Sequence, residues 1–128
     1  MLKPLPCLSA LALACLLLWP LAAQAQDVEA GQEVYMQYCA LCHGPQGKGD
    51  GSLSANLDPK PRNHTDGAYM NALSDGHLLK IVGEGGAAAG LSPIMPAWKD
   101  ILSAQQIQDV VAFVRTLAVP PYTPPTDE

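Results

Sequence analysis

The sequence contains few aromatic and few charged residues. Aromatic side chains make up 5% of the 128 residues, and charged side chains make up 15%. Seven basic residues face twelve acidic ones, giving a formal net charge of −5, and such a surface repels nucleic acid and anionic lipid. There is also no internal repeat and no run that alternates with the period of a β-strand. These absences argue against a nucleic-acid partner and predict one small, all-α domain.

Long apolar runs are lacking except near the N-terminus. Residues 1–25 open with Lys3, continue through an apolar stretch and end in Ala-Gln-Ala at 23–25, a small-x-small cleavage pattern. Pro20 interrupts the apolar run, which is shorter than the roughly 20 residues of a spanning helix. An uncleaved membrane anchor is therefore the less favoured alternative. We expect residues 1–25 to be a cleaved signal peptide, a periplasmic location, and no stable membrane insertion after cleavage.

Cysteine is also scarce, since the chain has four, of which Cys7 and Cys15 lie in the predicted signal peptide. Cys39 and Cys42 remain, too few for a disulfide framework. With His43 they form Cys-x-x-Cys-His, the signature of covalent haem attachment. Two thiols at this spacing can form thioethers with two neighbouring vinyl groups, and the adjacent imidazole can bind iron. The sequence predicts one haem c bound through the two cysteines, with the histidine as an axial ligand.

Rival roles for these two cysteines fit the sequence less well. A thioredoxin-like Cys-x-x-Cys is expected within a βαβ pattern, and no predicted strand precedes this one. A structural disulfide would close a very small loop and leave the domain with a thin core. Zinc would need four ligands, and His64 and His77 lack any paired spacing. We interpret both of these histidines as solvated residues, at a loop and at a helix start.

Three helices are expected, each after a polar capping residue. Asp27 and Ser74 are candidate N-caps, and Ser103 with Gln106 forms a capping box. Apolar residues follow each cap at helical spacing. The expected helices run from 28 to about 42, from 75 to 84, and from 104 to about 118.

The connections between these helices are long for so small a domain. Loops of this length usually indicate a function or a missing part of the core. A large, flat, mostly apolar cofactor would complete the core, and the loops would wrap around it. We expect a domain at residues 26–118, followed by a Pro-rich, disordered tail at 119–128.

Several segments resemble class I c-type cytochromes, and the likeness extends over nearly the whole mature chain. Gly31, Tyr35 and Phe113 stand where that family packs its first helix against its last. The glycine-rich loop 44–51 is similar to that of bacterial members, and 92–98 is similar to the loop that carries a methionine ligand. The resemblance implies a small cytochrome c fold, with three main helices and long loops around one covalently attached haem.

The resemblance also implies that Met95 is the second axial ligand. Pro93 and Pro96 flank it, and their fixed φ angles favour a stiff loop that can hold a thioether in place. A methionine is more often core filler, but the flanking prolines favour a ligand here. Met36 lies on the proximal helix and is therefore on the wrong side of the ring. The implied ligand pair is His43 and Met95.

This ligand pair indicates electron transfer. If the protein fills both axial positions, substrate cannot bind the iron, and exchange of one electron through the haem edge remains. No paired carboxylates, activated nucleophile or oxyanion device indicates an enzyme. The alternatives are an open-site haem protein, such as a peroxidase or gas sensor, and a fixed electron-transfer subunit of a dehydrogenase or oxidase complex. In each electron-transfer case the partners are redox proteins.

The basic residues are unevenly distributed along the chain. Most fall in the segment expected to surround the haem, whereas both ends of the mature chain are rich in acidic residues. We therefore predict a basic rim that favours an acidic partner. The residues of this predicted rim are Lys48, Lys60, Arg62, Lys80 and Lys99.

Overall fold

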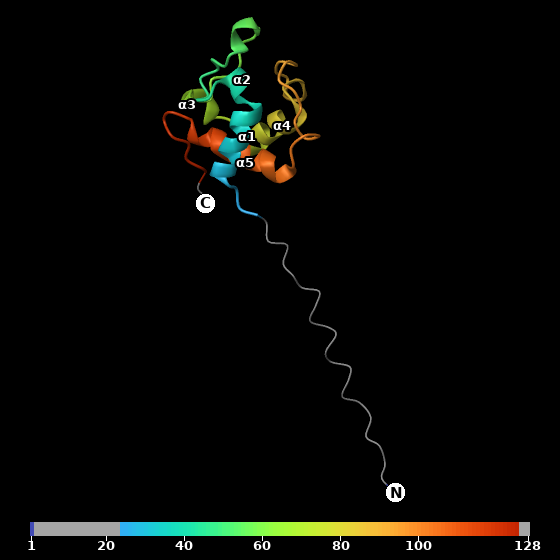
Figure 1. The fold of residues 1–128 in the computed structure, drawn as a ribbon. Coiled ribbons are helices and arrows are strands. Elements are labelled where there is room, and N and C mark those ends of the chain that lie inside the picture. The colour runs from blue at the N-terminus through green and yellow to red at the C-terminus, as the bar shows by residue number, and fades with distance from the viewer. Residues whose placement is uncertain (2–23, 126–128) are drawn as a thin grey trace.

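The computed structural model describes Met1 and residues 24–125, so the predicted signal peptide lies mostly outside the described residues. The regular elements of the described part are helices connected by long loops (Figure 1). None of these helices is long and apolar enough to cross a membrane. The α-helices are α1 (Val28–Tyr38), α2 (Ala40–His43), α3 (Gly67–Met70), α4 (Asp75–Glu84) and α5 (Ala104–Thr116), and the 3₁₀ helices are η1 (Ser54–Asn56) and η2 (Ala87–Ala89).

The capping residues act as the sequence predicted. The Asp27 side chain accepts hydrogen bonds from two backbone amides at the start of α1, and Ser74 accepts one at the start of α4. Ser103 and Gln106 form the expected capping box of α5. The first helix is shorter than expected, because it ends at Tyr38 and a separate turn, α2, follows.

Helices α1 and α5, the first and last long helices, cross and form the centre of the domain (Figure 1). Gly31 permits the crossing, because a Cβ added there would collide with the backbone carbonyl of Asp109 on α5. One turn further, Tyr35 is fully buried and packs against Phe113, with ring centroids 5.1 Å apart. This is the contact that the resemblance to class I cytochromes implied.

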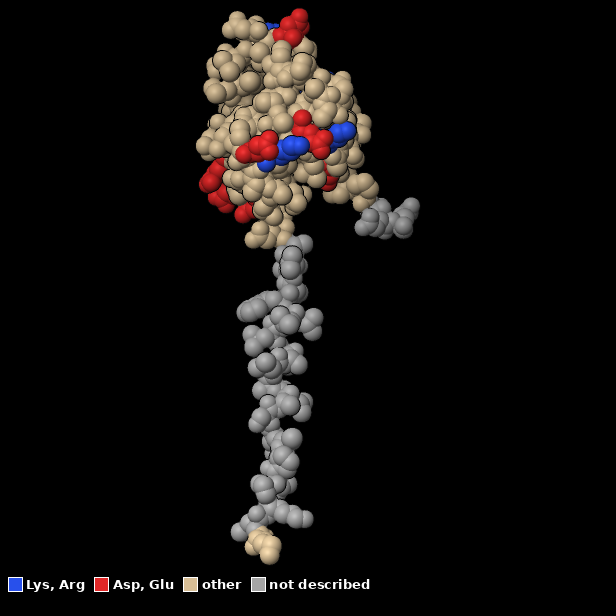
Figure 2. Space-filling view, turned by 90° about the vertical axis from the view of Figure 1, so that its right-hand side faces the viewer, with Lys and Arg blue, Asp and Glu red and all other residues tan. Residues whose placement is uncertain are grey.

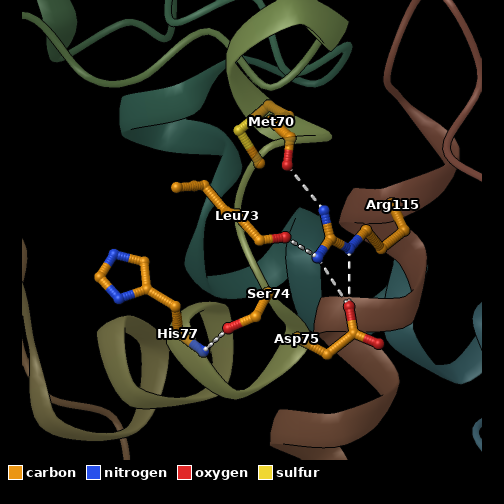
Figure 3. Close-up of polar contacts among 6 residues, drawn as sticks. All are labelled: Met70, Leu73, Ser74, Asp75, His77 and Arg115. Carbon is orange, nitrogen blue, oxygen red and sulfur yellow. Dashed lines mark hydrogen bonds and ion pairs between the residues drawn. The ribbon is translucent and has the colours of Figure 1, made fainter. Parts of the chain in front are cut away.

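Arg115 of α5 fastens the connection between α3 and α4 (Figure 3). Its guanidinium donates hydrogen bonds to the backbone carbonyls of Met70 and Leu73 and pairs with the carboxylate of Asp75. Arg115 is 8% exposed, so these partners satisfy a charge that would otherwise be costly to bury. We call this group the Arg115 clasp. It fixes the backbone of two residues that line the cavity described below.

The residues after α5 make specific contacts with the domain. The amide of Val119 donates to the carbonyl of Thr65 at 3.0 Å, and the guanidinium of Arg115 lies 3.9 Å from the ring centroid of Tyr122. The sequence predicted a disordered tail at 119–128, and within the described part of this segment Val119 and Tyr122 contact the domain. The hydrogen bond joins segments distant in sequence, and therefore no local pattern indicates it.

Candidate haem site

A cavity of about 470 Å³ lies between α2, α4 and the loops that follow them. This volume is within the usual range of ligand pockets, which is roughly 300–1,000 Å³. All four predicted site residues line it, and they come from distant parts of the chain. Figure 1 shows the loop after α4, in yellow to orange, rising beside α2. The four residues are Cys39, Cys42, His43 and Met95.

The two cysteines lie at the junction of α1 and α2. Cys39 is the C-cap of α1, its amide donates to the carbonyl of Tyr35 at 2.9 Å, and Cys42 is on the following turn. Both thiols are free and partly buried. Burial, together with the neighbouring Cys42, raises the pKa of Cys39 to about 12. A thiol protonated at neutral pH is a poor thiolate nucleophile, which argues against a thioredoxin-like use of this pair.

His43 is oriented by a backbone carbonyl. Its Nδ1 lies 2.9 Å from the carbonyl oxygen of Arg62, and because a carbonyl only accepts, Nδ1 carries the proton. Burial lowers the pKa of His43, so the ring is neutral at physiological pH. The lone pair of a neutral imidazole of this tautomer is on Nε2. Nε2 is thus the atom available to a metal, and a carbonyl partner of this kind is typical of metal-binding histidines.

The Met95 loop is tied to the end of α4. The amide of Gly86 donates to the carbonyl of Met95 at 3.0 Å, and Gly85 ends α4 with a φ of 85°. A Cβ added at Gly86 would collide with the carbonyl of Ser92, so the loop closes tightly over this glycine pair. The sequence indicated Gly85 as the end of the helix, but the role of the second glycine was missed. The feature that could have indicated it is the Gly-Gly pair, which is typical of a tight turn.

His64 was interpreted from the sequence as a solvated residue, and that interpretation is wrong. It lines the cavity, and its ring stacks on that of His43 with centroids 4.3 Å apart and an interplanar angle of 19°. Burial, and then the neighbouring His43 and Arg62, lower the pKa of His64 to about 3. Since 21 residues separate the two histidines, no helical or strand spacing could have indicated the contact.

The border of the cavity is more apolar than predicted. Of the five residues of the predicted basic rim, Lys60 and Arg62 line the cavity. The Lys60 ammonium donates to two backbone carbonyls, and the Arg62 guanidinium stacks on Tyr69. On the face in Figure 2, charges of both signs lie side by side across the middle of the domain, and most of its upper part is uncharged. Four cavity-lining residues are exposed and carry large aliphatic side chains, and we call them the apolar rim: Leu41, Leu53, Leu91 and Ile94.

Comparison with known proteins identifies the family. The family model described as Cytochrome c matches residues 28–118, which include the whole cavity lining. The chain belongs to the cytochrome c family. Its cofactor is accordingly a covalently bound haem c. The observed residues fit this group, because free thiols, a neutral imidazole and a thioether border one apolar cavity.

Several relatives of this cytochrome are much longer redox proteins or subunits. It is 34% identical over 88 residues to the cytochrome c subunit of a quinone alcohol dehydrogenase of Gluconobacter oxydans, covering 67% of this chain and 18% of the relative. It is 29% identical to quinohemoprotein alcohol dehydrogenase ADH IIB of Pseudomonas putida, covering 74% of this chain and 12% of the relative. The cytochrome thus spans less than a third of either relative.

Solved structures give the same fold. A chain of the Kuenenia stuttgartiensis reducing HAO-like protein complex Kustc0457/Kustc0458 is 33% identical, with a TM-score of 0.63 over 80% of this cytochrome and 49% of that chain. The KustC0563 c-type cytochrome is 25% identical, with a TM-score of 0.57 over 69% of this chain and 96% of that one. The fold is therefore the small all-α cytochrome c fold that the sequence predicted.

Proposed function

We propose that this cytochrome carries single electrons on one haem c, attached through Cys39 and Cys42 and ligated by His43 and Met95. The observation that carries the proposal is that these four side chains line a single apolar cavity. Bound haem supplies an iron that alternates between the ferrous and ferric states. The two cysteines would fix the haem ring. The Nε2 atom of His43 carries no proton at neutral pH, so its lone pair is free to bind the iron.

A role in electron transfer, rather than catalysis, follows from the proposed ligands. With an imidazole and a thioether on the iron, no coordination position is open to peroxide, dioxygen or an organic substrate. A peroxidase or gas sensor needs such a position, so these alternatives are less well supported. We propose that the protein is not an enzyme by itself.

We further propose that the partners are redox proteins of the periplasm. The predicted signal peptide at residues 1–25 supports this location. Relatives named as cytochrome c subunits of dehydrogenases support a role beside a larger enzyme, either as a fixed subunit or as a shuttle.

Spectroelectrochemical titration of the purified holoprotein tests the function. We expect a single transition that fits one electron per haem, and no change in the reduced spectrum under carbon monoxide, because Met95 occupies the sixth position. A protein that binds carbon monoxide readily at neutral pH would contradict the proposal and favour the open-site alternative.

If electrons leave the protein through the apolar rim, the rate of electron transfer should fall when a charge is placed on that rim. Leu91 is 42% exposed and lines the cavity. Leu91→Glu is expected to slow electron self-exchange between oxidised and reduced copies about fivefold, because two like charges that meet across the interface cost ~1 kcal/mol in water. NMR line broadening in mixed oxidation states measures this rate.

The control for that measurement is Ile101→Glu, at a residue that is 62% exposed and does not line the cavity. It adds the same charge to the protein and should change self-exchange much less. Equal slowing by both variants would show that net charge, and not the rim, governs the rate.

A further inference from the structure

His64 contacts two residues that belong to the proximal side of the proposed site. Its ring stacks on His43, with centroids 4.3 Å apart, and meets the ring of Tyr35 edge-on at 5.9 Å. Tyr35 is 0% exposed and is itself held by the hydrogen bond that its hydroxyl donates to the carbonyl of Gly44 at 2.9 Å. His64 therefore connects the proposed iron ligand to a fixed point of the core.

The backbone of His64 is held as firmly as its ring. Its amide donates to the carbonyl of Gly47 at 2.6 Å. Gly47 has a φ of 77°, and a Cβ added there would lie 3.2 Å from Cβ of His64, so the two segments are in close contact. Gly47 belongs to the loop that leads directly out of His43, and both histidines are thus anchored to the same short segment.

One hydrogen bond does not by itself fix the plane of an axial imidazole. The Nδ1–H bond of His43 to the carbonyl of Arg62 restrains the direction of that atom, but the ring can still rock about it. A second flat ring at van der Waals distance limits this rotation, because turning would drive the edge of one ring into the face of the other. His64 provides such a ring, since it stacks on His43 with an interplanar angle of 19°.

We propose that His64 is a positioning residue that fixes the ring plane of His43 against the haem iron. The inference rests on the proposed function, in which His43 is the axial ligand. The plane of an axial imidazole sets the magnetic asymmetry of ferric haem, and its Nδ1–H bond sets the basicity of the ligand. His64 thus acts on the electronic structure of the iron without touching it.

The test compares a variant that removes the flat ring with one that keeps it. In the oxidised holoprotein, His64→Ala is expected to shift the lowest-field EPR g value, to change the spread of the haem methyl proton shifts, and to change the reduction potential. His64→Phe presents a similar flat face and should restore values close to those of the wild type. If His64→Ala does not fold, His64→Leu, which keeps most of the volume but not the flat face, replaces it.

Leu102→Ala is the matched control, because Leu102 is 4% exposed and does not line the cavity. It loosens the core without touching His43 and should leave the spectra unchanged. Wild-type spectra in His64→Ala, or the same change in Leu102→Ala, would overturn the positioning role. A low-spin ferric spectrum that survives in the double variant His43→Ala/His64→Ala, which removes both imidazoles, would instead contradict the proposed function, so the two failures are distinguishable.

Discussion

Replacing Cys39 and Cys42 together with serine is expected to leave a protein without a cooperative fold. Without attached haem, the apolar side chains that line the cavity of about 470 Å³ are exposed to water, and each one left exposed forgoes ~1.5–3 kcal/mol of burial. Small domains have about 5–15 kcal/mol of stability in total. Exposure of a few of these side chains therefore costs about as much as the whole fold contributes, and collapse of the loops recovers only part of it.

Far-ultraviolet circular dichroism and thermal melting of the haem-free variant measure this outcome. Cys42→Ser alone, which keeps one thiol for attachment, is the control and should retain haem and a cooperative melt. Native helix content with a sharp transition in the doubly substituted, haem-free protein would show that the chain needs no cofactor to fold.

The second large effect is expected for Met95→Ala. A thioether favours ferrous iron, and axial ligands set haem potentials over about 0.8 V, so the potential should fall by more than ~0.1 V. The near-infrared sulfur-to-iron charge-transfer band of the oxidised protein should disappear. Carbon monoxide should bind the reduced form, because the sixth position is open.

Two other methionines serve as controls for this ligand. Met36 is 47% exposed on α1, and Met70 is 2% exposed and lines the cavity. Met36→Leu and Met70→Leu should keep the charge-transfer band and exclude carbon monoxide. If the charge-transfer band is lost in Met70→Leu and retained in Met95→Ala, the axial ligand is Met70 and not Met95.

The parts of the fold that the sequence predicted depend on short-range patterns. The caps at Asp27, Ser74 and Ser103 each act within three residues of their own position, so one sequence is enough to recognise them. The site motif of Cys39, Cys42 and His43 is equally local. Met95 is distant from that motif, and its proposed role came from resemblance to a known loop and from its flanking prolines.

What the sequence did not indicate depends on contacts between distant segments. The stacking of His64 on His43, the Arg115 clasp and the hydrogen bond of Val119 to Thr65 each join residues whose separation has no characteristic period. The apolar rim was missed for a related reason. The charged residues close to the cavity point toward backbone carbonyls or aromatic rings. Which apolar residues stay exposed is decided only by packing.

The crossing of α1 and α5 has a consequence for the order in which the molecule is made. The two helices are the first and last long helices of the domain, so Gly31 and Tyr35 meet their partners only after the rest of the domain has been synthesised. The Arg115 clasp is on the same last helix, and closing so long a loop is entropically costly and slow. Because the haem-free chain is expected to lack a cooperative fold, Cys39 and Cys42 remain accessible after synthesis, and α5 packs against α1 stably only once the cofactor is in place.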